Sequence, residues 1–253
     1  MYAEERRAHL TVQLRREGRL DVARAADDLN VTGETVRRDL IELERQGVLR
    51  RTHGGAIPVE TLGFEPETTV RAAAMVEQKR RIAQAAVAEL PAEGAIILDT
   101  GTTTALFAEF LPTDRKLTVV TNSLQALNML VAKRNITVMA IGGRLRPESL
   151  STVDLWAQRE LADVHVDLAF IGTNGLTVER GLTTSDQSEA VIKGQMITCA
   201  RRVVLLADHS KVGTEYFHRV ADLSQIDVLI TDTELDEDLA ADLRATGLTV
   251  IAA

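Results

Sequence analysis

The chain has 253 residues and a formal net charge of -8, with 29 Lys and Arg against 37 Asp and Glu. This length suits one large domain, or a small domain followed by a medium one. The single cysteine, Cys199, excludes an intrachain disulfide, suits a reducing compartment and is expected to be a small buried apolar residue. Because no apolar run approaches the roughly 18 residues that span a membrane and the charged start lacks a signal-peptide core, we expect a cytoplasmic protein without a membrane segment.

The positive charge is concentrated near the N-terminus. Residues 1–57 carry 11 Lys and Arg against 10 Asp and Glu, whereas the rest of the chain carries 18 against 27. The arginines of the first segment crowd between positions 37 and 51. A local basic patch can bind phosphate groups even on an acidic protein. This segment is therefore a candidate for nucleic-acid binding.

The first 57 residues predict three short helices and a hairpin. The stretch EERRAHLTVQLRREG is typical of a helix that ends at Gly18. The next stretch, VARAADDL, repeats apolar residues at i, i+3, i+4 and i+7, and Asp21 is placed to cap it. A third helix begins after Thr32, which can serve as its N-cap, and ends at Gly47. Two short extended runs in VLRRTHGGAIP then surround adjacent glycines that suit a tight turn.

This order of elements is that of a winged helix-turn-helix, in which the third helix enters the DNA major groove and the hairpin contacts the backbone or minor groove. A buried stripe of Val36, Leu40 and Leu43 leaves Arg38 on the outer face. Arginine suits this place because its planar guanidinium can donate two hydrogen bonds to guanine or phosphate. Alternatively, Arg38 belongs to a solvated salt-bridged face, since glutamates stand four residues before and after it. Basic residues on the following hairpin favour nucleic-acid binding.

The rest of the chain predicts a linker and an α/β domain. Residues 58–75 contain two prolines and no clean period, so we interpret them as a linker running into a helix, and EQKRRIAQAAVAEL is helical up to Pro91. Seven short apolar runs then alternate with helix-length segments, which predicts a mostly parallel, Rossmann-like sheet with helices on both faces. The domains are thus residues 1–57, a linker at 58–75 and a second domain at 76–253. The seven runs are AIILD, LTVVT, ITVMAIG, VDLAFIG, RVVLLAD, DVLITD and LTVIA.

Polar turns follow several of these strands. AIILD runs into TGTTTALFAEF, where a glycine and three threonines offer backbone N–H groups and hydroxyls to an anion, although such turns are often only helix caps. Other strands end in TNS, GGR, GTNG and DHSK, and the strand ends of a parallel sheet can converge on one cleft. Lys211 would supply the cation that a phosphate requires. The candidate anion-binding residues are Asp99, Gly101, Thr102, Thr103, Thr104, Thr121, Asn122, Ser123, Gly142, Gly143, Asn174, Asp208 and Lys211.

The stretch TVRRDLIELERQGVLRRTHGGA resembles the signature of the DeoR family of bacterial transcription regulators. Their recognition helix carries a Thr-x-Arg-Arg-Asp-Leu core, and their wing ends in His-Gly-Gly-Ala. The resemblance implies a winged helix that binds operator DNA, usually as a repressor. The DNA-facing residues that it implies are Thr35, Arg37, Arg38, Arg50, Arg51 and His53, with Gly54 and Gly55 shaping the wing tip.

The remaining chain resembles the sugar-phosphate sensor domain of the same family through DTGTTT, TNS, GG and D-x-S-K. That domain is related in fold to ribose-5-phosphate isomerase, and ARRVVLLADHSKVG is similar to a segment of the enzyme. Where the isomerase uses paired carboxylates to move a proton, this chain has Ile171 and Asn174, which implies binding without catalysis. A second departure is Asp154, where relatives usually have glycine; a role in ligand choice and a role in a turn both stay open.

These features predict a DNA-binding repressor that a phosphorylated sugar releases from its operator. We expect a homodimer or higher homo-oligomer, and neither a cofactor nor a metal. Fructose 1-phosphate is the leading hypothesis for the effector, because the opening MYAEER is similar to fructose-operon repressors of high-GC bacteria. The alternatives are a sugar-phosphate isomerase with an appended helical domain, and an activator or an adaptor that binds protein through its winged helix.

Overall fold

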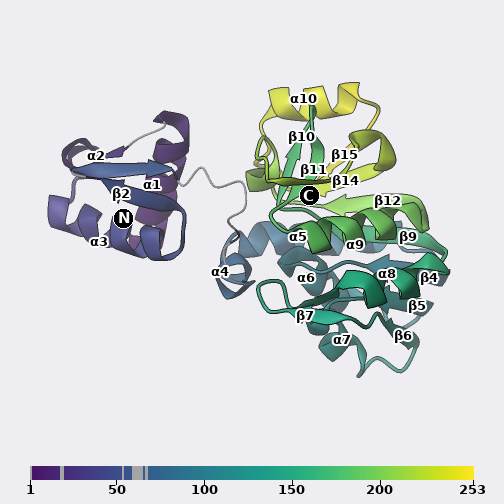
Figure 1. The fold of residues 1–253 in the computed structure, drawn as a ribbon. Helices are drawn as coiled ribbons and strands as arrows, with labels where there is room; N and C mark the ends of the chain where they lie inside the picture. Colours follow the sequence, from purple (N-terminus) through teal and green to yellow (C-terminus); the bar gives the residue numbers. More distant parts are fainter. Residues whose placement is uncertain (1, 18–19, 53, 59–64, 66–67) are drawn as a thin grey trace. The chain divides into compact units, whose positions relative to one another are not determined.

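The computed structural model describes residues 2–17, 20–52, 54–58, 65 and 68–253. The chain divides into two compact units, residues 1–70 and residues 71–253. Figure 1 shows both units, which are described separately here. Within the described residues, no helix combines the length and the apolar character needed to cross a bilayer.

The first unit has the predicted winged helix-turn-helix order of elements (Figure 1). Both predicted caps form: the Asp21 carboxylate accepts hydrogen bonds from two backbone N–H groups of α2, and the Thr32 hydroxyl accepts one from Thr35 in α3. The β2–β3 hairpin is joined by a two-residue strand, β1, which the sequence did not predict. The elements are α1 (Ala3–Glu17), β1 (Leu20–Asp21), α2 (Val22–Asp28), α3 (Gly33–Arg45), β2 (Leu49–Thr52) and β3 (Gly55–Pro58).

A small apolar core holds this unit together. The predicted stripe of α3 is buried, with Val36, Leu40 and Leu43 at most 4% exposed, and it packs with side chains from α1, α2 and the hairpin. A salt bridge also connects two helices of this unit, because Arg6 of α1 pairs with the buried Asp39 of α3. The core therefore uses one face of α3 and leaves the opposite face to solvent.

The seven predicted apolar runs of the second unit form one parallel sheet, which confirms the predicted fold class. The strand order is β15-β14-β12-β9-β4-β5-β6, so β4, the first strand in the sequence, lies near the centre and later strands extend the sheet on both sides. Every neighbouring pair is parallel, so all seven carboxyl ends meet at one edge. The strands are β4 (Glu93–Leu98), β5 (Lys116–Thr121), β6 (Ile136–Ala140), β9 (Val166–Gly172), β12 (Ala200–Leu206), β14 (Val228–Thr231) and β15 (Thr249–Ala252).

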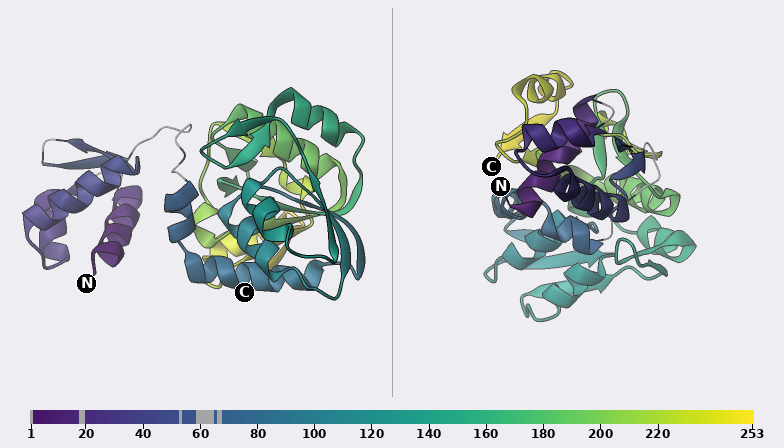
Figure 2. Two further views of the ribbon diagram at one scale, coloured as in Figure 1. Left: turned by 90° about the horizontal axis from the view of Figure 1, so that it is seen from below. Right: turned by 90° about the vertical axis from the view of Figure 1, so that its left-hand side faces the viewer.

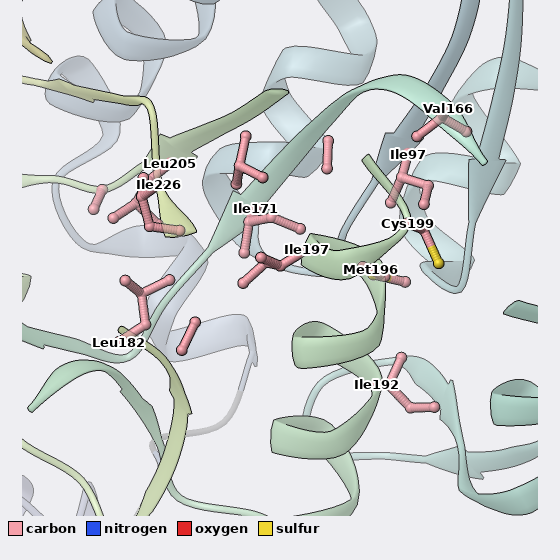
Figure 3. Packing of buried hydrophobic residues seen from close by; sticks show 14 of the residues in the cluster. Ile97, Val166, Ile171, Leu182, Ile192, Met196, Ile197, Cys199, Leu205 and Ile226 are labelled. Atoms are coloured by element: carbon pink, nitrogen blue, oxygen red, sulfur yellow. The ribbon is translucent and has the colours of Figure 1, made fainter. Parts of the chain in front are cut away.

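Helices cover both faces of this sheet, and each face has its own apolar core. On one face α5, α6 and α7 contribute to a cluster in which the rings of Phe107 and Phe170 lie 4.4 Å apart. On the other face α8, α9 and α10 contribute to the cluster that Figure 3 shows, which includes the buried Cys199. Figure 2 gives two further views of the arrangement. The helices are α5 (Val76–Ala86), α6 (Thr102–Phe110), α7 (Leu124–Leu130), α8 (Asp154–Ala162), α9 (Gln187–Thr198) and α10 (Glu237–Ala245).

Several short elements were not predicted. They include a β7–β8 hairpin and an antiparallel sheet of order β10-β11-β13. Their strands have three or four residues, too few to establish an apolar period. The short helix α4 lies in the predicted linker and crosses the division between the two units. The bounds are α4 (Thr68–Ala73), β7 (Arg144–Arg146), β8 (Ser151–Val153), β10 (Gly175–Thr177), β11 (Gly181–Thr184) and β13 (His218–Ala221), with short 3-10 turns at Val87–Glu89, His209–Lys211 and Leu223–Gln225.

Candidate functional site

The outer face of α3 is basic and open to solvent. The side chains of Arg37 and Arg38 are 61% and 79% exposed, and Thr35, which lies beside the N-cap, is partly exposed. Both arginines approach Glu34, with nitrogen–oxygen distances of 3.6 and 3.7 Å. Exposed ion pairs of this length contribute little stability. The guanidinium groups are therefore available to a ligand at little energetic cost.

The salt-bridged alternative for Arg38 finds limited support. Glu42, four residues further along α3, is instead bound by Arg45 at 2.8 Å and by Gln46 at 2.9 Å. These hydrogen bonds lower the pKa of Glu42. Arg38 has only the longer approach to Glu34, so most of its donor groups are not committed to α3 itself.

The wing carries the second group of predicted DNA-facing residues. Arg51 is exposed, but its backbone N–H and its guanidinium both donate to Glu44 of α3, at 2.9 and 2.5 Å. Gly54 is exposed, whereas Gly55 is buried, and a Cβ there would lie 2.0 Å from the carbonyl oxygen of Leu20. Gly55 thus allows β3 to approach β1. His53 and the side chain of Arg50 lie outside the described residues.

Asp99, directly after β4, is one of the fully buried residues of the predicted anion site. Its side chain is fully buried, forms an ion pair with Lys193 of α9, and accepts a 2.9 Å hydrogen bond from the backbone N–H of Gly172 at the end of β9. Burial raises the pKa of Asp99, against the opposing effect of Lys193. The carboxyl ends of β4 and β9 are thereby linked to α9.

Among the described residues, three buried side-chain oxygens at the strand ends of this sheet edge lack hydrogen-bond partners, one of them Thr231 Oγ1 at the end of β14. Asp99 Oδ1 is buried and unpaired, and so is Asn122 Oδ1 at the end of the neighbouring strand β5. The Asn122 amide nitrogen is already used, because it donates to the carbonyl oxygen of Thr152 at 3.0 Å. Buried acceptors without partners are rare and costly, and they are commonly satisfied by water or a ligand. The oxygens of Asp99 and Asn122 can both accept a hydroxyl donor.

Several predicted hydroxyls instead have local structural roles. Thr121 Oγ1 donates to the carbonyl oxygen of Leu98 at 2.6 Å, and Thr104 Oγ1 donates to that of Gly101 at 3.0 Å. Ser123 Oγ caps α7 by accepting from the backbone of Ala126. These residues shape the strand ends. The nearby residues with some exposure at the start of α6 are Gly101 and Thr102, while Thr103 is buried.

The DHSK turn after β12 brings a second cluster of charge to the same edge. Asp208 is buried, and its carboxylate accepts from the backbone N–H of Ser210 at 3.1 Å. Lys211, in the same turn, and Asn174, after β9, are partly exposed. Both Asp208 and Lys211 interact electrostatically with Lys79 of α5, whose pKa is lowered to about 8, mainly by burial.

Gly142 and Gly143 belong to a different neighbourhood. The backbone N–H of Gly142 donates to Glu160 of α8 at 2.6 Å, and a Cβ on Gly143 would lie 2.4 Å from the carbonyl oxygen of Val153. Asp154 starts α8 with a φ of 78° and pairs with Arg144 of β7. A position with positive φ suits glycine, so the backbone here adopts a conformation that glycine takes without strain.

Sequence reasoning missed a set of buried charges behind the strand ends. Glu189 and Lys193 lie one turn apart in α9 and are both 3% exposed. Glu189 accepts from Arg146 at 3.2 Å and from Thr184 Oγ1 at 3.2 Å. The available signal was the pair of opposite charges, four residues apart, within the otherwise apolar stretch EAVIKGQMI.

One grouping among the described residues has the spacing of metal ligands: His209, Asp232 and Glu234, whose ligand atoms lie within 4.8 Å of one another. Local bonds already engage these groups. His209 and the backbone of Glu234 hydrogen-bond to Asp232, and the Glu234 carboxylate pairs with Arg81 at 2.9 Å. The arrangement is explained as a link between the ends of β12 and β14.

The chain matches two domain models and is similar to many proteins, among them transcriptional regulators. Residues 6–61 match the DeoR-like helix-turn-helix domain, and residues 74–233 match the DeoR C terminal sensor domain. The HTH-type transcriptional regulator GlpR of Haloferax volcanii is 39% identical over 98% of this chain and 97% of its own length. The HTH-type transcriptional repressor GlcR of Bacillus subtilis is 34% identical over 92% of this chain and 89% of its own length.

Two solved structures resemble the chain at low identity. Ribose 5-phosphate isomerase A of Methanocaldococcus jannaschii is 20% identical over 54% of each chain, with a TM-score of 0.41. The sorbitol operon regulator SorC of Klebsiella pneumoniae is 13% identical over 88% of this chain and 93% of its own, with a TM-score of 0.42. From its two domain matches and its near full-length relatives, the chain is a member of the DeoR family of helix-turn-helix transcriptional regulators, not an enzyme.

Proposed function

We propose that this regulator is a repressor that a phosphorylated sugar releases from its operator. The observation that carries the effector half is the polar carboxyl edge of the parallel sheet, where Asp99 Oδ1 and Asn122 Oδ1 are buried without partners. Both atoms accept hydrogen bonds, and a sugar hydroxyl is a suitable donor for each. In open parallel sheets, this edge is also where ligands usually bind.

The phosphate of such a ligand would be held at the same edge. The backbone N–H groups at the start of α6, next to Gly101 and Thr102, offer donors and the positive end of a helix dipole. Lys211 supplies a cation on the turn after β12. We assign hydroxyl recognition to Asp99 and Asn122, and phosphate recognition to these two elements.

DNA binding is assigned to the exposed face of α3 and to the wing. Arg38 lies on α3 opposite its buried stripe, on the face that a recognition helix presents to the major groove, and the exposed Arg37 lies to one side of it. Thr35, Arg50, Arg51 and His53 complete the proposed set. Gly54 and Gly55 shape the hairpin that carries the last three.

Release follows from linkage between the two sites. An effector that binds the DNA-free arrangement more tightly than the DNA-bound one must weaken operator binding, typically by about 1–3 kcal/mol. We propose a homodimer or higher homo-oligomer, because a change in the spacing of two winged helices would spoil their match to two half-sites. Fructose 1-phosphate is the first effector to test, on the resemblance of MYAEER to fructose-operon repressors.

Calorimetric titration of the full-length protein with a panel of sugar phosphates tests the effector site. We expect at least one member to bind, and Lys211→Met to weaken that binding about tenfold or more, because an ion pair with the phosphate is lost. Lys116→Met is the matched control, since this exposed lysine begins β5 at the opposite end of the sheet. Absence of binding by every member, or equal affinity for the wild-type and Lys211→Met proteins, contradicts the assignment.

A further inference from the structure

Lys79 is a buried cation that holds the end of the short helix α4. It is 3% exposed, and its Nζ atom donates to the carbonyl oxygens of Arg71 and Ala74, the latter at 2.8 Å. These carbonyls lie where α4 ends, before Met75 turns the chain into α5 with a φ of 53°. The last carbonyls of a helix lack the usual partners four residues on, and here the Arg71 carbonyl has a 3.4 Å hydrogen bond from the backbone N–H of Ala74, to which Lys79 adds a second donor.

The surroundings of Lys79 connect this contact with the proposed effector site. Its ammonium is attracted by Asp208 and repelled by Lys211, both on the turn after β12. A phosphate at Lys211 would cancel that repulsion and add negative charge nearby. It would therefore compete with the two α4 carbonyls for the same ammonium group.

A second contact ties the same end of α4 to another part of the effector site. The Arg71 guanidinium donates to the carbonyl oxygen of Glu148 at 3.0 Å, in the loop between β7 and β8. The next carbonyl, that of Ser149, accepts from Thr100 Oγ1 at 3.0 Å, and Thr100 directly precedes the start of α6. Hydrogen bonds thus link the end of α4 to the loop that holds Thr100, whereas the turn after β12 acts on Lys79 through its charges.

The place of α4 in the chain connects these contacts with the winged helix. Helix α4 spans Thr68–Ala73, across the division between the two compact units, so its carboxyl end belongs to the second unit. Any change at its carboxyl end is covalently connected to the winged helix. We infer that Lys79 is a positioning residue that couples effector binding to DNA binding, by holding the end of α4 through the carbonyl oxygens of Arg71 and Ala74. This inference rests on the proposed function.

The test compares operator binding with and without effector in the wild-type and Lys79→Met proteins. The probe is fructose 1-phosphate, or the panel member that binds the wild-type protein. In fluorescence anisotropy with DNA from upstream of the gene, the effector is expected to weaken wild-type operator binding about 5- to 150-fold. Lys79→Met should bind the effector in calorimetry, yet its operator affinity should change less than about twofold on adding it, because the ammonium that senses the phosphate is missing.

Two further variants make the result decisive. Lys133→Met is the matched control, because Lys133 also donates to the last carbonyls of a helix, those of Glu109 and Leu111 in and after α6; it should keep the wild-type response. Arg71→Gln removes the second contact and should also lower the response, which provides a test if Lys79→Met does not fold by circular dichroism. Full responses in both Lys79→Met and Arg71→Gln overturn the inference alone. A wild-type protein that no panel member releases overturns the proposed function, and the inference with it.

Discussion

The buried cations Lys193 and Lys79 of the sensor unit differ in their partners. Asp99 and Lys193 neutralise each other, and Glu189 is paired with Arg146, so these charges are compensated where they are buried. Lys79 differs, because backbone carbonyls are its hydrogen-bond partners and its pKa is lowered to about 8, mainly by burial. It is therefore a cation whose burial costs stability and whose charge responds to its neighbours.

This property predicts a pH dependence of stability. Below pH 8 Lys79 is protonated in both states, and burial of its charge destabilises the folded protein; the shift from 10.5 to about 8 corresponds to roughly 3 kcal/mol. Between these values the folded state releases the proton while the unfolded state keeps it, so the free energy of unfolding rises with pH. In urea denaturation, the free energy of unfolding of the wild-type protein, relative to that of Lys79→Met, should be higher at pH 10 than at pH 7. Parallel pH profiles for the two proteins would contradict this.

Among the elements, α3 and the wing have different expected roles in DNA binding. Arg38 projects from the exposed face of α3, where a base edge is within reach of a recognition helix, whereas Arg51 is half-exposed on the hairpin and bound to Glu44. Arg38→Ala should weaken specific binding by about 1–3 kcal/mol if it contacts a base. Arg51→Ala should weaken binding to all sequences alike and reduce the salt dependence, as loss of a phosphate contact does.

Anisotropy titrations with operator and scrambled DNA at several salt concentrations would measure both effects. Arg159→Ala, an exposed arginine on α8 of the sensor unit, is the control and should leave both affinities unchanged. If Arg38→Ala and Arg51→Ala both bind operator like the wild type, the exposed face of α3 and the wing are not the DNA-binding surface.

The sequence predicts elements that are defined by local pattern. The stripe Val36, Leu40 and Leu43 predicted which face of α3 is buried, and the seven apolar runs predicted the strands of the parallel sheet. The residues after those strands predicted the polar edge. The sequence did not predict the pairing of Asp99 with Lys193, because these residues are 94 positions apart and only the packing of α9 brings them together.

Local pattern also failed to separate polar side chains that have structural hydrogen-bond partners from those that have none. Thr121 and Asn122 are neighbours in one TNS turn, yet the Thr121 hydroxyl is satisfied by Leu98 whereas Asn122 Oδ1 has no partner. Short strands such as β10 and β11 were missed, since three or four residues do not establish a period. Such roles depend on tertiary contacts that a single sequence does not contain.

At the scale of the whole molecule, the proposal is one of linkage between two units joined by α4. The first unit has its own apolar core and an exposed basic helix face, and the second has its own two cores and a polar sheet edge. Neither site alone makes a regulated repressor. The coupling free energy between them is the quantity that defines its function, and it must be the same whichever ligand binds first.

The coupling is measured by the affinity of the full-length protein for DNA upstream of its own gene, by fluorescence anisotropy with and without sugar phosphates. We expect tight, salt-dependent binding with a log–log slope of about -0.9 per phosphate contacted. We also expect one sugar phosphate, with fructose 1-phosphate tested first, to weaken it about 5- to 150-fold. Operator binding that no member of a broad panel of sugar phosphates alters would contradict the account.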